Sequence, residues 1–336
     1  MRIERSLAVA LLGAAGLLLA APAPARAADT VEASLILNWI AGGDHAPYYY
    51  AKQEGWYEAA GLDLDIEQGK GSQLAAQRVG IGSNELGLAD MGVVLIAKGE
   101  GAEVVAIMNV YANTPQGFYW LKSSGIEGPK DFPGKKIGNP PGDAARAMFP
   151  AFAQAVGIEA DSVQWINVQA NAKLSALKAG SIDVTTSFYN IHHIFQAQLG
   201  DDMGFVSWAE VGVNPYGNSL IANAEFLEEN PEAVRAFVEV TQKAFAHCVE
   251  EPEACVAALV AANTGLKQDN ELQNWELVTE LMSNEHSRTV GLGHFEEARM
   301  TDDYALVDQY FEIKNPFEVE SAYTNEFIDT SIKMPD

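Results

Sequence analysis

Basic residues are scarce in this chain of 336 residues. Lysine and arginine together number 21, whereas aspartate and glutamate number 46, which gives a formal net charge of −25 at pH 7. So acidic a chain repels phosphate backbones and anionic lipid headgroups. The composition therefore argues against nucleic acid and anionic membranes as partners, and we interpret the charge itself as a source of solubility.

Catalytic and cofactor-binding motifs are also missing. The sequence holds no GxSxG, P-loop or HExxH motif, and no GxGxxG motif between a strand and a helix. His192 and His193 are neighbours on a predicted helix, so their rings point apart and are poorly placed to share a metal ion. We therefore predict no metal, no organic cofactor and no catalytic residues.

Cysteine occurs only twice, as Cys248 and Cys255 in the segment HCVEEPEAC. Pro252 between them breaks a helix, so the pair is expected to join the end of one helix to the start of the next. In an oxidising compartment a structural disulfide is the favoured interpretation, with two free thiols as the alternative. A metal site is less favoured, because only His247 adjoins the pair.

Long apolar runs are confined to the N-terminus. Arg2 and Arg5 precede an apolar stretch at residues 6–21, and Ala25-Arg26-Ala27 provides small residues at a cleavage site. This is the pattern of a secretory signal peptide, so residues 1–27 are expected to be removed and the protein to be periplasmic. Because no second stretch approaches the length that spans a bilayer, we expect an exported, soluble chain.

Strand and helix patterns alternate through much of the remaining sequence and predict an α/β fold with two units. Strands of the first unit are expected at residues 33–37, 62–66, 86–89 and 104–110, in a mostly parallel sheet. Strands of the second are expected at residues 118–121, 135–138, 163–168, 184–188 and 205–208. Turn residues near Asn113 and Asn214 mark two crossovers between the units.

This organisation predicts two lobes joined by a hinge, with a ligand cleft between them. Lobe 1 is expected at residues 28–112, lobe 2 at residues 113–212, and a return to lobe 1 with C-terminal helices at residues 213–336. We expect the protein to be a monomer.

The strongest candidate for ligand binding is the stretch at residues 35–61. A predicted strand ends at Asn38-Trp39, a glycine turn follows, and a helix begins near His45. Open α/β folds bind ligands at the carboxyl ends of their strands. We therefore predict ligand contacts from Asn38, Trp39, His45, Tyr48 and Tyr49. Core packing is the alternative for Trp39 and His45, and three consecutive tyrosines on a helix cannot all share one face.

Other candidates follow later strands and the second crossover. Asp90 ends a predicted strand, where it either contacts ligand or caps the next helix. Ligand contacts are also predicted from Phe188, Tyr189, Asn190, Tyr216 and Asn218. Arg146 lies one turn inside a predicted helix, where it either supplies charge for an anionic ligand or is a surface residue.

Several segments, taken in order, resemble the NMT1/THI5-like family. They are LNW at residues 37–39, AKQEGWYEAAGLDLDIE at 51–67, SSGIEGPKDFPGKKIG at 123–138, NAEFLEENPEAVRAFVEVTQKA at 223–244 and YTNEF at 323–327. The resemblance implies a type II periplasmic binding protein that serves an ABC importer, with a permease and an ATPase as partners. It also implies a ligand similar to a thiamine pyrimidine precursor, with sulfonates, nitrate or aromatic acids as alternatives. A role as a sensor partner stays open.

The same family contains pyrimidine synthases, which carry a lysine and a histidine where this chain resembles them at Ala89 and Val93. They also carry a cysteine-rich segment where this chain has residues 213–217. Since the lysine and the cysteines are missing, we predict that the chain is not an enzyme. Pyrimidine-binding members place a carboxylate where this chain has Tyr189, so the resemblance leaves open whether the ligand is an aminopyrimidine.

Overall fold

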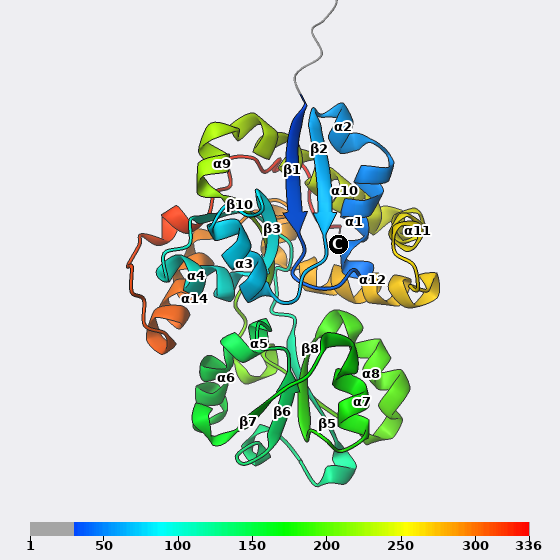
Figure 1. Cartoon of the computed structure of the whole chain (residues 1–336), viewed down its shortest axis with the longest axis vertical. Helices are drawn as coiled ribbons and strands as arrows, with labels where there is room; N and C mark the ends of the chain where they lie inside the picture. Colours follow the sequence, from blue (N-terminus) through cyan, green and yellow to red (C-terminus); the bar gives the residue numbers. More distant parts are fainter. Residues whose placement is uncertain (1–29, 336) are drawn as a thin grey trace, which may run out of the picture.

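The computed structural model describes residues 30–335 and shows two α/β lobes, each built around its own five-stranded sheet (Figure 1). The two-lobed α/β architecture predicted from the sequence is therefore confirmed. The predicted signal peptide, residues 1–27, lies outside the described residues.

The sheet of lobe 1 contains four mutually parallel strands and one antiparallel strand that returns from lobe 2. Its order is β2 (Leu62–Glu67), β1 (Val31–Ile36), β3 (Leu86–Asp90), β10 (Asn218–Asn223) and β4 (Val104–Asn109). β10 runs antiparallel to both β3 and β4. β4 therefore runs parallel to β1, β2 and β3, and the mostly parallel sheet predicted from the sequence is confirmed. β10 is antiparallel because it enters the sheet from the second crossover, at the end where β1 and β3 leave it.

The sheet of lobe 2 repeats this arrangement. Its order is β7 (Gln164–Asn167), β6 (Lys136–Asn139), β8 (Val184–Phe188), β5 (Gln116–Leu121) and β9 (Met203–Ser207). β6 runs parallel to β7 and β8, whereas β5 runs antiparallel to β8 and β9. β5 follows the first crossover as β10 follows the second. Each sheet therefore has its antiparallel strand where the chain arrives from the other lobe.

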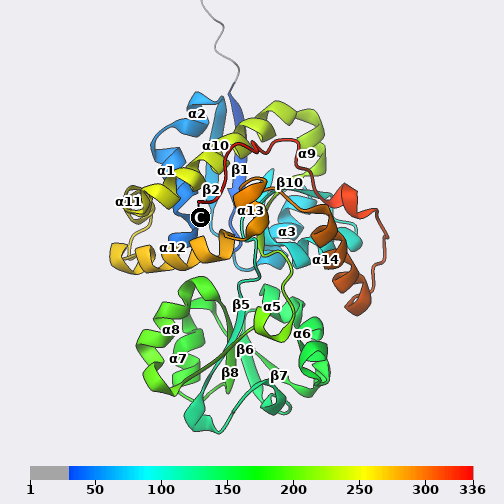
Figure 2. The same cartoon turned by 180° about the vertical axis from the view of Figure 1, so that it is seen from behind.

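Helices cover both faces of each sheet. One face of lobe 1 packs against α1 (Ala46–Gln53), α2 (Trp56–Ala59), α10 (Pro231–Glu250), α11 (Pro252–Ala262) and α12 (Gln268–Met282). The other face packs against α3 (Ser72–Gly80), α4 (Met91–Gly99) and α14 (Glu297–Tyr310). Two shorter helices, α9 (Ala224–Glu229) and α13 (Glu285–Thr289), complete this lobe (Figure 2).

Lobe 2 carries α5 (Ala144–Ala147), α6 (Phe149–Val156), α7 (Lys173–Lys178) and α8 (His192–Leu199). Across residues 30–335, no helix combines the length and the apolar character that crossing a membrane requires. After α14 the chain returns over lobe 1, where Phe327 and Met334 are buried.

The predicted disulfide between Cys248 and Cys255 is confirmed. Cys248 lies near the end of α10 and Cys255 near the start of α11, whose first residue is Pro252. Both cysteines are fully buried, and the indole of Trp275 donates a hydrogen bond of 2.9 Å to the carbonyl oxygen of Cys248. The cross-link therefore fixes the α10–α11 corner against α12.

The two crossovers form a hinge in which each segment holds the other. The backbone N–H of Thr114 donates to Asn214 Oδ1 at 2.8 Å, and Asn214 Nδ2 donates to Asn113 Oδ1 at 3.3 Å. Each crossover is also tied to a buried carboxyl group of lobe 1. Gln116 Nε2 donates to Asp90 Oδ2 at 3.1 Å, and the backbone N–H of Tyr216 donates to Asp303 Oδ2 at 2.9 Å.

Replacing both cysteines by serine is expected to lower the free energy of unfolding by about 2 kcal/mol, because the short loop they close gains freedom in the unfolded chain. Thermal unfolding with and without a reductant measures the effect. The wild-type protein should lose stability on reduction and the double variant should not. An unfolding midpoint of the wild-type protein that reductant leaves unchanged contradicts the prediction.

Asp303→Asn is expected to weaken the pH dependence of stability. Burial is the main cause that raises the pKa of Asp303 from 3.8 to about 7. The folded protein therefore holds more protons than the unfolded chain between these values, and this group's stability contribution falls as pH rises from about 4 to 7. Between pH 5 and pH 8, the titration of Asp303 accounts for a decrease of at most about 3 kcal/mol in the free energy of unfolding.

Unfolding midpoints of the wild-type protein and Asp303→Asn at pH 5 and pH 8 test this expectation. The asparagine retains an acceptor for the N–H of Tyr216, so the hinge contact itself survives. Asp308→Asn, the same change at an exposed position of the same helix, serves as the control. Equal pH dependence in all three proteins overturns the prediction.

Candidate functional site

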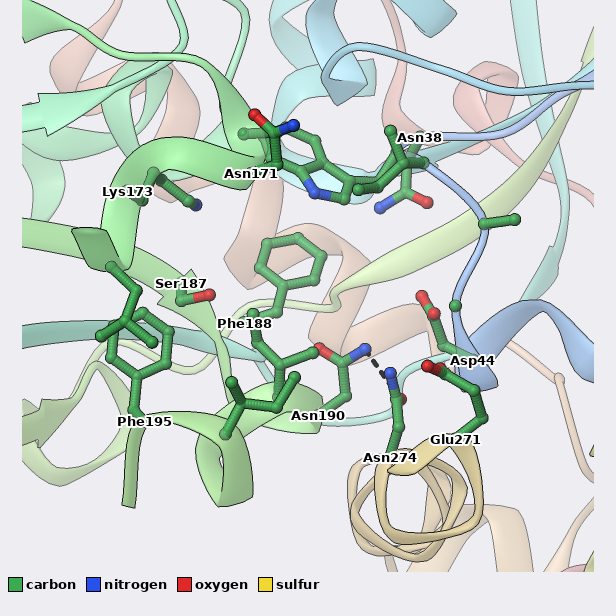
Figure 3. Close-up of a pocket in the computed structure, with 18 of the residues that line it drawn as sticks. Asn38, Asp44, Asn171, Lys173, Ser187, Phe188, Asn190, Phe195, Glu271 and Asn274 are labelled. Carbon is green, nitrogen blue, oxygen red and sulfur yellow. Dashed lines mark hydrogen bonds between the residues drawn. The ribbon is translucent and has the colours of Figure 1, made fainter. Parts of the chain in front are cut away.

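A cavity of about 320 Å³ lies between the lobes and takes its walls from both (Figure 3). Lobe 1 contributes the loop after β1 and side chains of α12. Lobe 2 contributes the end of β8 and the start of α7 and α8. The apolar walls include Trp39, Ile40, Leu174, Phe188, Ile194 and Phe195. The cavity is thus a largely apolar slot with polar groups at selected positions, which suits a small organic ligand.

Backbone hydrogen bonds fix the loop after β1. The N–H of Gly69 donates to the carbonyl oxygen of Trp39 at 2.9 Å, and the N–H of Gly71 donates to that of Asn38 at 2.8 Å. A Cβ atom at Gly69 would overlap the carbonyl oxygen of Leu37, so this close approach requires glycine. The loop thereby holds Asn38 and Trp39 at the cavity wall.

Asn38 is oriented by two buried residues behind it. The N–H of Gly42 donates to His45 Nδ1 at 3.2 Å, and His45 Nε2 lies 3.0 Å from Asn38 Oδ1. Burial outweighs the attraction of Asp44 and lowers the pKa of His45, so its imidazole is neutral. With Nδ1 accepting, Nε2 carries the proton and donates to Asn38 Oδ1. Asn38 Nδ2 in turn donates to Asn218 Oδ1 at 3.2 Å.

Two carboxyl groups, those of Asp44 and Glu271, mark the lobe 1 side of the cavity. Tyr111 Oη donates to Asp44 Oδ2 at 3.3 Å, and the N–H of Gly43 donates to Glu271 Oε2 at 2.7 Å. Burial raises the pKa of both groups, and the charge of Asp44 raises the pKa of Glu271 further. This end of the cavity therefore presents carboxyl oxygens that accept hydrogen bonds and that, when ionised, attract a cation.

Lys173 lies on the opposite side, across Phe188 in Figure 3. Its side chain is 5 % exposed, with Nζ 3.7 Å from Asp143 Oδ2 and 5.0 Å from the centre of the Trp39 ring. Burial lowers the pKa of Lys173 and the charge of Asp143 opposes this effect. Since Trp39 belongs to lobe 1 and Lys173 to lobe 2, their contact joins the lobes directly.

The lobes also meet at the rims of the cavity. Asn190 Nδ2 donates to Asn274 Oδ1 at 3.0 Å, which connects the end of β8 to α12 (Figure 3). On the other rim the N–H of Gln73 donates to the carbonyl oxygen of Gly142 at 3.3 Å. The structure is therefore a closed arrangement of the two lobes.

Four of the predicted site residues line this cavity: Asn38, Trp39, Phe188 and Asn190. Their contact with a ligand stays a prediction. His45 and Asn218 do not line the cavity and instead orient Asn38 from behind. Their predicted placement at the cavity is thus corrected to supporting positions, because both are buried beneath the loop after β1.

The remaining candidates lie elsewhere, and their expected placement on the cleft is corrected. Tyr48 is fully buried with its ring 5.3 Å from that of Phe245, and Tyr49 packs beside the same core, because α1 turns both toward other helices. Asp90 is the last residue of β3 and the N-cap position of α4, and its carboxyl group accepts a hydrogen bond from Gln116. Tyr189 packs on His192 and starts a short helical turn, Tyr189–Ile191, that contacts α12 of lobe 1.

Tyr216 belongs to the hinge and does not line the cavity. Its backbone N–H donates to Asp303, and its hydroxyl oxygen accepts from the N–H of Glu296 at 3.0 Å. Arg146 is also outside the cavity: it donates to Asn167 at 2.7 Å and stacks on the Trp165 ring. The structure therefore provides no support for an anion site built on Arg146.

Sequence reasoning missed Asp44, Asp143, Lys173, Glu271 and Asn274 as lining residues. Asp44 could have been found, because it follows the two glycines of the turn after β1. The other four could not have been found, because the local sequence around them does not indicate which parts of a helix face the opposite lobe. Within residues 30–335, no three histidine, cysteine, aspartate or glutamate side chains are grouped as a metal site.

Residues 43–255 match the sequence model of a family described as NMT1/THI5 like. A relative from Legionella pneumophila, named 4-amino-5-hydroxymethyl-2-methylpyrimidine phosphate synthase, is 25% identical over 88% of this chain and 92% of its own length. A formylaminopyrimidine-binding protein from Halalkalibacterium halodurans is 24% identical over 77% of this chain and 79% of its own. The riboflavin-binding protein RibY from Chloroflexus aurantiacus is 25% identical over 92% of this chain and 89% of its own length.

Among solved structures, the alkanesulfonate-binding protein SsuA from Xanthomonas axonopodis pv. citri, bound to MOPS, superposes with a TM-score of 0.68. It is 12% identical, and the match covers 89% of this chain and 99% of that protein. At this identity the likeness establishes the fold alone. The type II periplasmic binding fold implied by the resemblance is therefore confirmed.

The prediction that the chain is not an enzyme is contradicted. Several relatives, from Legionella and from fungi, carry the name of a pyrimidine phosphate synthase at 25–27% identity. The prediction depended on residue types that are missing at positions assigned by resemblance, Ala89, Val93 and residues 213–217, and not on the contents of the cavity. The cavity contains an amine and three carboxyl groups, which that reasoning did not consider.

Gly71→Ala is expected to hold the lobes apart. Gly71 has φ of +125°, and a Cβ atom there would overlap the carbonyl oxygen of Gly142 in lobe 2. The radius of gyration from small-angle X-ray scattering should therefore be larger in Gly71→Ala than in the wild-type protein.

The matched control is Gly125→Ala, a glycine with φ of +79° and no atom within 4 Å of the added Cβ. Alanine at this left-handed position also introduces backbone strain, about 1 kcal/mol, without blocking the approach of the lobes. If the two variants have the same radius of gyration as the wild-type protein, the glycine contact does not control closure.

Proposed function

This chain belongs to the NMT1/THI5-like family, and on that premise we propose that it captures a small, flat heteroaromatic molecule between its lobes. Its role is that of the solute-binding component of an ABC importer. Hinge closure around the ligand produces the form that docks on a membrane permease, and an ATPase subunit drives uptake. The protein acts in the periplasm after removal of residues 1–27, as a monomer.

The observation that carries this proposal is the aromatic cavity shared by both lobes. Trp39 from lobe 1 and Phe188 from lobe 2 offer flat faces to one space of about 320 Å³. A planar ring stacks on such faces and is removed from water when the lobes meet. Asn38 and Asn190 supply polar groups that can fix the orientation of the ring.

The relatives support the same ligand class. Two of them are named for binding a formylaminopyrimidine and riboflavin, both of which are heteroaromatic. The alternative class, a sulfonate or nitrate, requires an accessible cation. Lys173 is the one basic residue on the cavity wall, and Asp143 already neutralises it at 3.7 Å. A neutral or cationic heterocycle therefore fits the cavity better than an anion.

Catalysis on a pyrimidine is the second candidate function, supported by the synthase-named relative that covers most of this chain. Lys173 is the observation in the cavity that favours it. Burial lowers the pKa of this amine, so a larger fraction is uncharged than at a surface lysine. An uncharged amine is the form that attacks carbonyl carbon.

A thermal-shift screen of residues 28–336 tests the binding function. The panel contains aminopyrimidines, riboflavin, alkanesulfonates and nitrate. Aminopyrimidines or riboflavin should raise the unfolding temperature, because a ligand that binds only the folded state stabilises it. Trp39→Ala should weaken binding at least about tenfold through the loss of stacking.

Trp56→Ala is the matched control, a half-buried tryptophan on lobe 1 that does not line the cavity. Stabilisation by sulfonates or nitrate alone contradicts the proposed ligand class. Mass spectrometry of each recovered ligand separates the two functions: an unchanged ligand supports capture, and a converted ligand supports catalysis.

A further inference from the structure

We infer that Asp44 and Glu271 form a seat for a positively charged or N–H-donating nitrogen of the ligand. This inference rests on the proposed function and adds one property of the ligand, a cationic or N–H-donating nitrogen that faces lobe 1. Figure 3 shows the side chains of Asp44 and Glu271 on the same side of the cavity.

Neither carboxyl group has a cationic partner. The lysine and arginine ion pairs formed within residues 30–335 include neither Asp44 nor Glu271. His45 Nδ1 lies 3.2 Å from Asp44 Oδ1, but burial keeps this imidazole neutral. Within residues 30–335 the chain therefore provides no lysine or arginine at ion-pair distance from either carboxyl group.

Both groups are also held in place by neutral donors. Glu271 Oε2 accepts from the N–H of Gly43, and Glu271 Oε1 accepts from Asn270 Nδ2 at 3.1 Å. Asp44 accepts from the hydroxyl of Tyr111. Burying unpaired charge costs free energy, and a ligand nitrogen between the carboxyl groups would remove much of that cost.

The lysine end of the cavity contrasts with this arrangement. Asp143 neutralises Lys173, and Asp143 is itself fixed by the N–H of Ala145 at 3.0 Å and the hydroxyl of Thr186 at 3.3 Å. Lys173 thus already has a carboxylate partner, whereas Asp44 and Glu271 have no lysine or arginine partner among the described residues. A ligand that enters the cavity therefore gains most from presenting its donor edge to lobe 1.

The test uses three planar probes that differ mainly in charge: benzamidine as the cation, benzamide as the neutral probe and benzoate as the anion. Isothermal titration of residues 28–336 at pH 7.5 gives the dissociation constant of each. We expect benzamidine to bind at least about tenfold more tightly than benzamide, and benzoate to bind most weakly.

Glu271→Gln should abolish the preference for benzamidine over benzamide. Glu276→Gln makes the same chemical change at an exposed position of the same helix and should keep the wild-type preference. Asp44→Asn should reduce the preference in the same direction as Glu271→Gln. Circular dichroism confirms that each variant is folded.

Benzoate binding as tightly as benzamidine, or an unchanged preference in Glu271→Gln, overturns the inference. Failure of benzamidine to bind the wild-type protein also overturns it. If the heterocycles of the thermal-shift panel bind in that case, the proposed function stands without this seat. If they do not, the proposed function fails as well.

Discussion

The double passage of the chain between the sheets is the constraint on which the rest of the structure depends. Two crossovers, linked by Thr114 and Asn214, leave one antiparallel strand in each sheet. They also bring the carboxyl ends of β1 and β8 to face one another. The loops that follow these strands consequently line one space, and a ligand there contacts both lobes. Neither lobe alone provides a closed cavity.

Electrostatics divides this cavity into two unequal ends. At the lobe 2 end, Lys173 and Asp143 neutralise each other and Lys173 also contacts the Trp39 ring. At the lobe 1 end, Asp44 and Glu271 lie close together without a cation. In a buried site, an uncompensated charge influences ligand choice more than a compensated one, because water cannot screen it. We therefore expect the acidic end to dominate ligand selectivity, although the cavity also contains a lysine.

The sequence predicts those features that have a local cause. The strand ending at Asn38-Trp39, the glycine turn and the proline between the cysteines each restrict the backbone within a few residues, and the two α/β units follow from their periodicity. Asn38 and Trp39 are on the cavity wall for this reason. The burial of Tyr48 could not be predicted from the sequence, because only the packing of α1 against α10 decides which of the three consecutive tyrosines is buried.

Features that depend on contacts between distant parts of the chain have no such local cause and could not be predicted from the sequence. Glu271 enters the cavity from a C-terminal helix more than 200 residues after the loop it contacts, with Gly43 as its hydrogen-bond donor. Strand β10 takes a central place in lobe 1 because it arrives through the hinge, which the alternation of strands and helices does not reveal. Tertiary placement decides both cases.

The carboxyl groups of Asp44 and Glu271 also affect how Tyr189 is interpreted, the position where pyrimidine-binding members of the family have a carboxylate. The resemblance led us to expect a carboxylate after β8, in lobe 2, and this chain has a tyrosine there that packs on His192. The structure provides two carboxyl groups from lobe 1 instead, on the opposite wall of the same cavity. A donor-bearing ring can be held from either wall, since the stacking faces of Trp39 and Phe188 do not distinguish its edges. The missing carboxylate in lobe 2 is therefore no argument against an aminated ring as ligand.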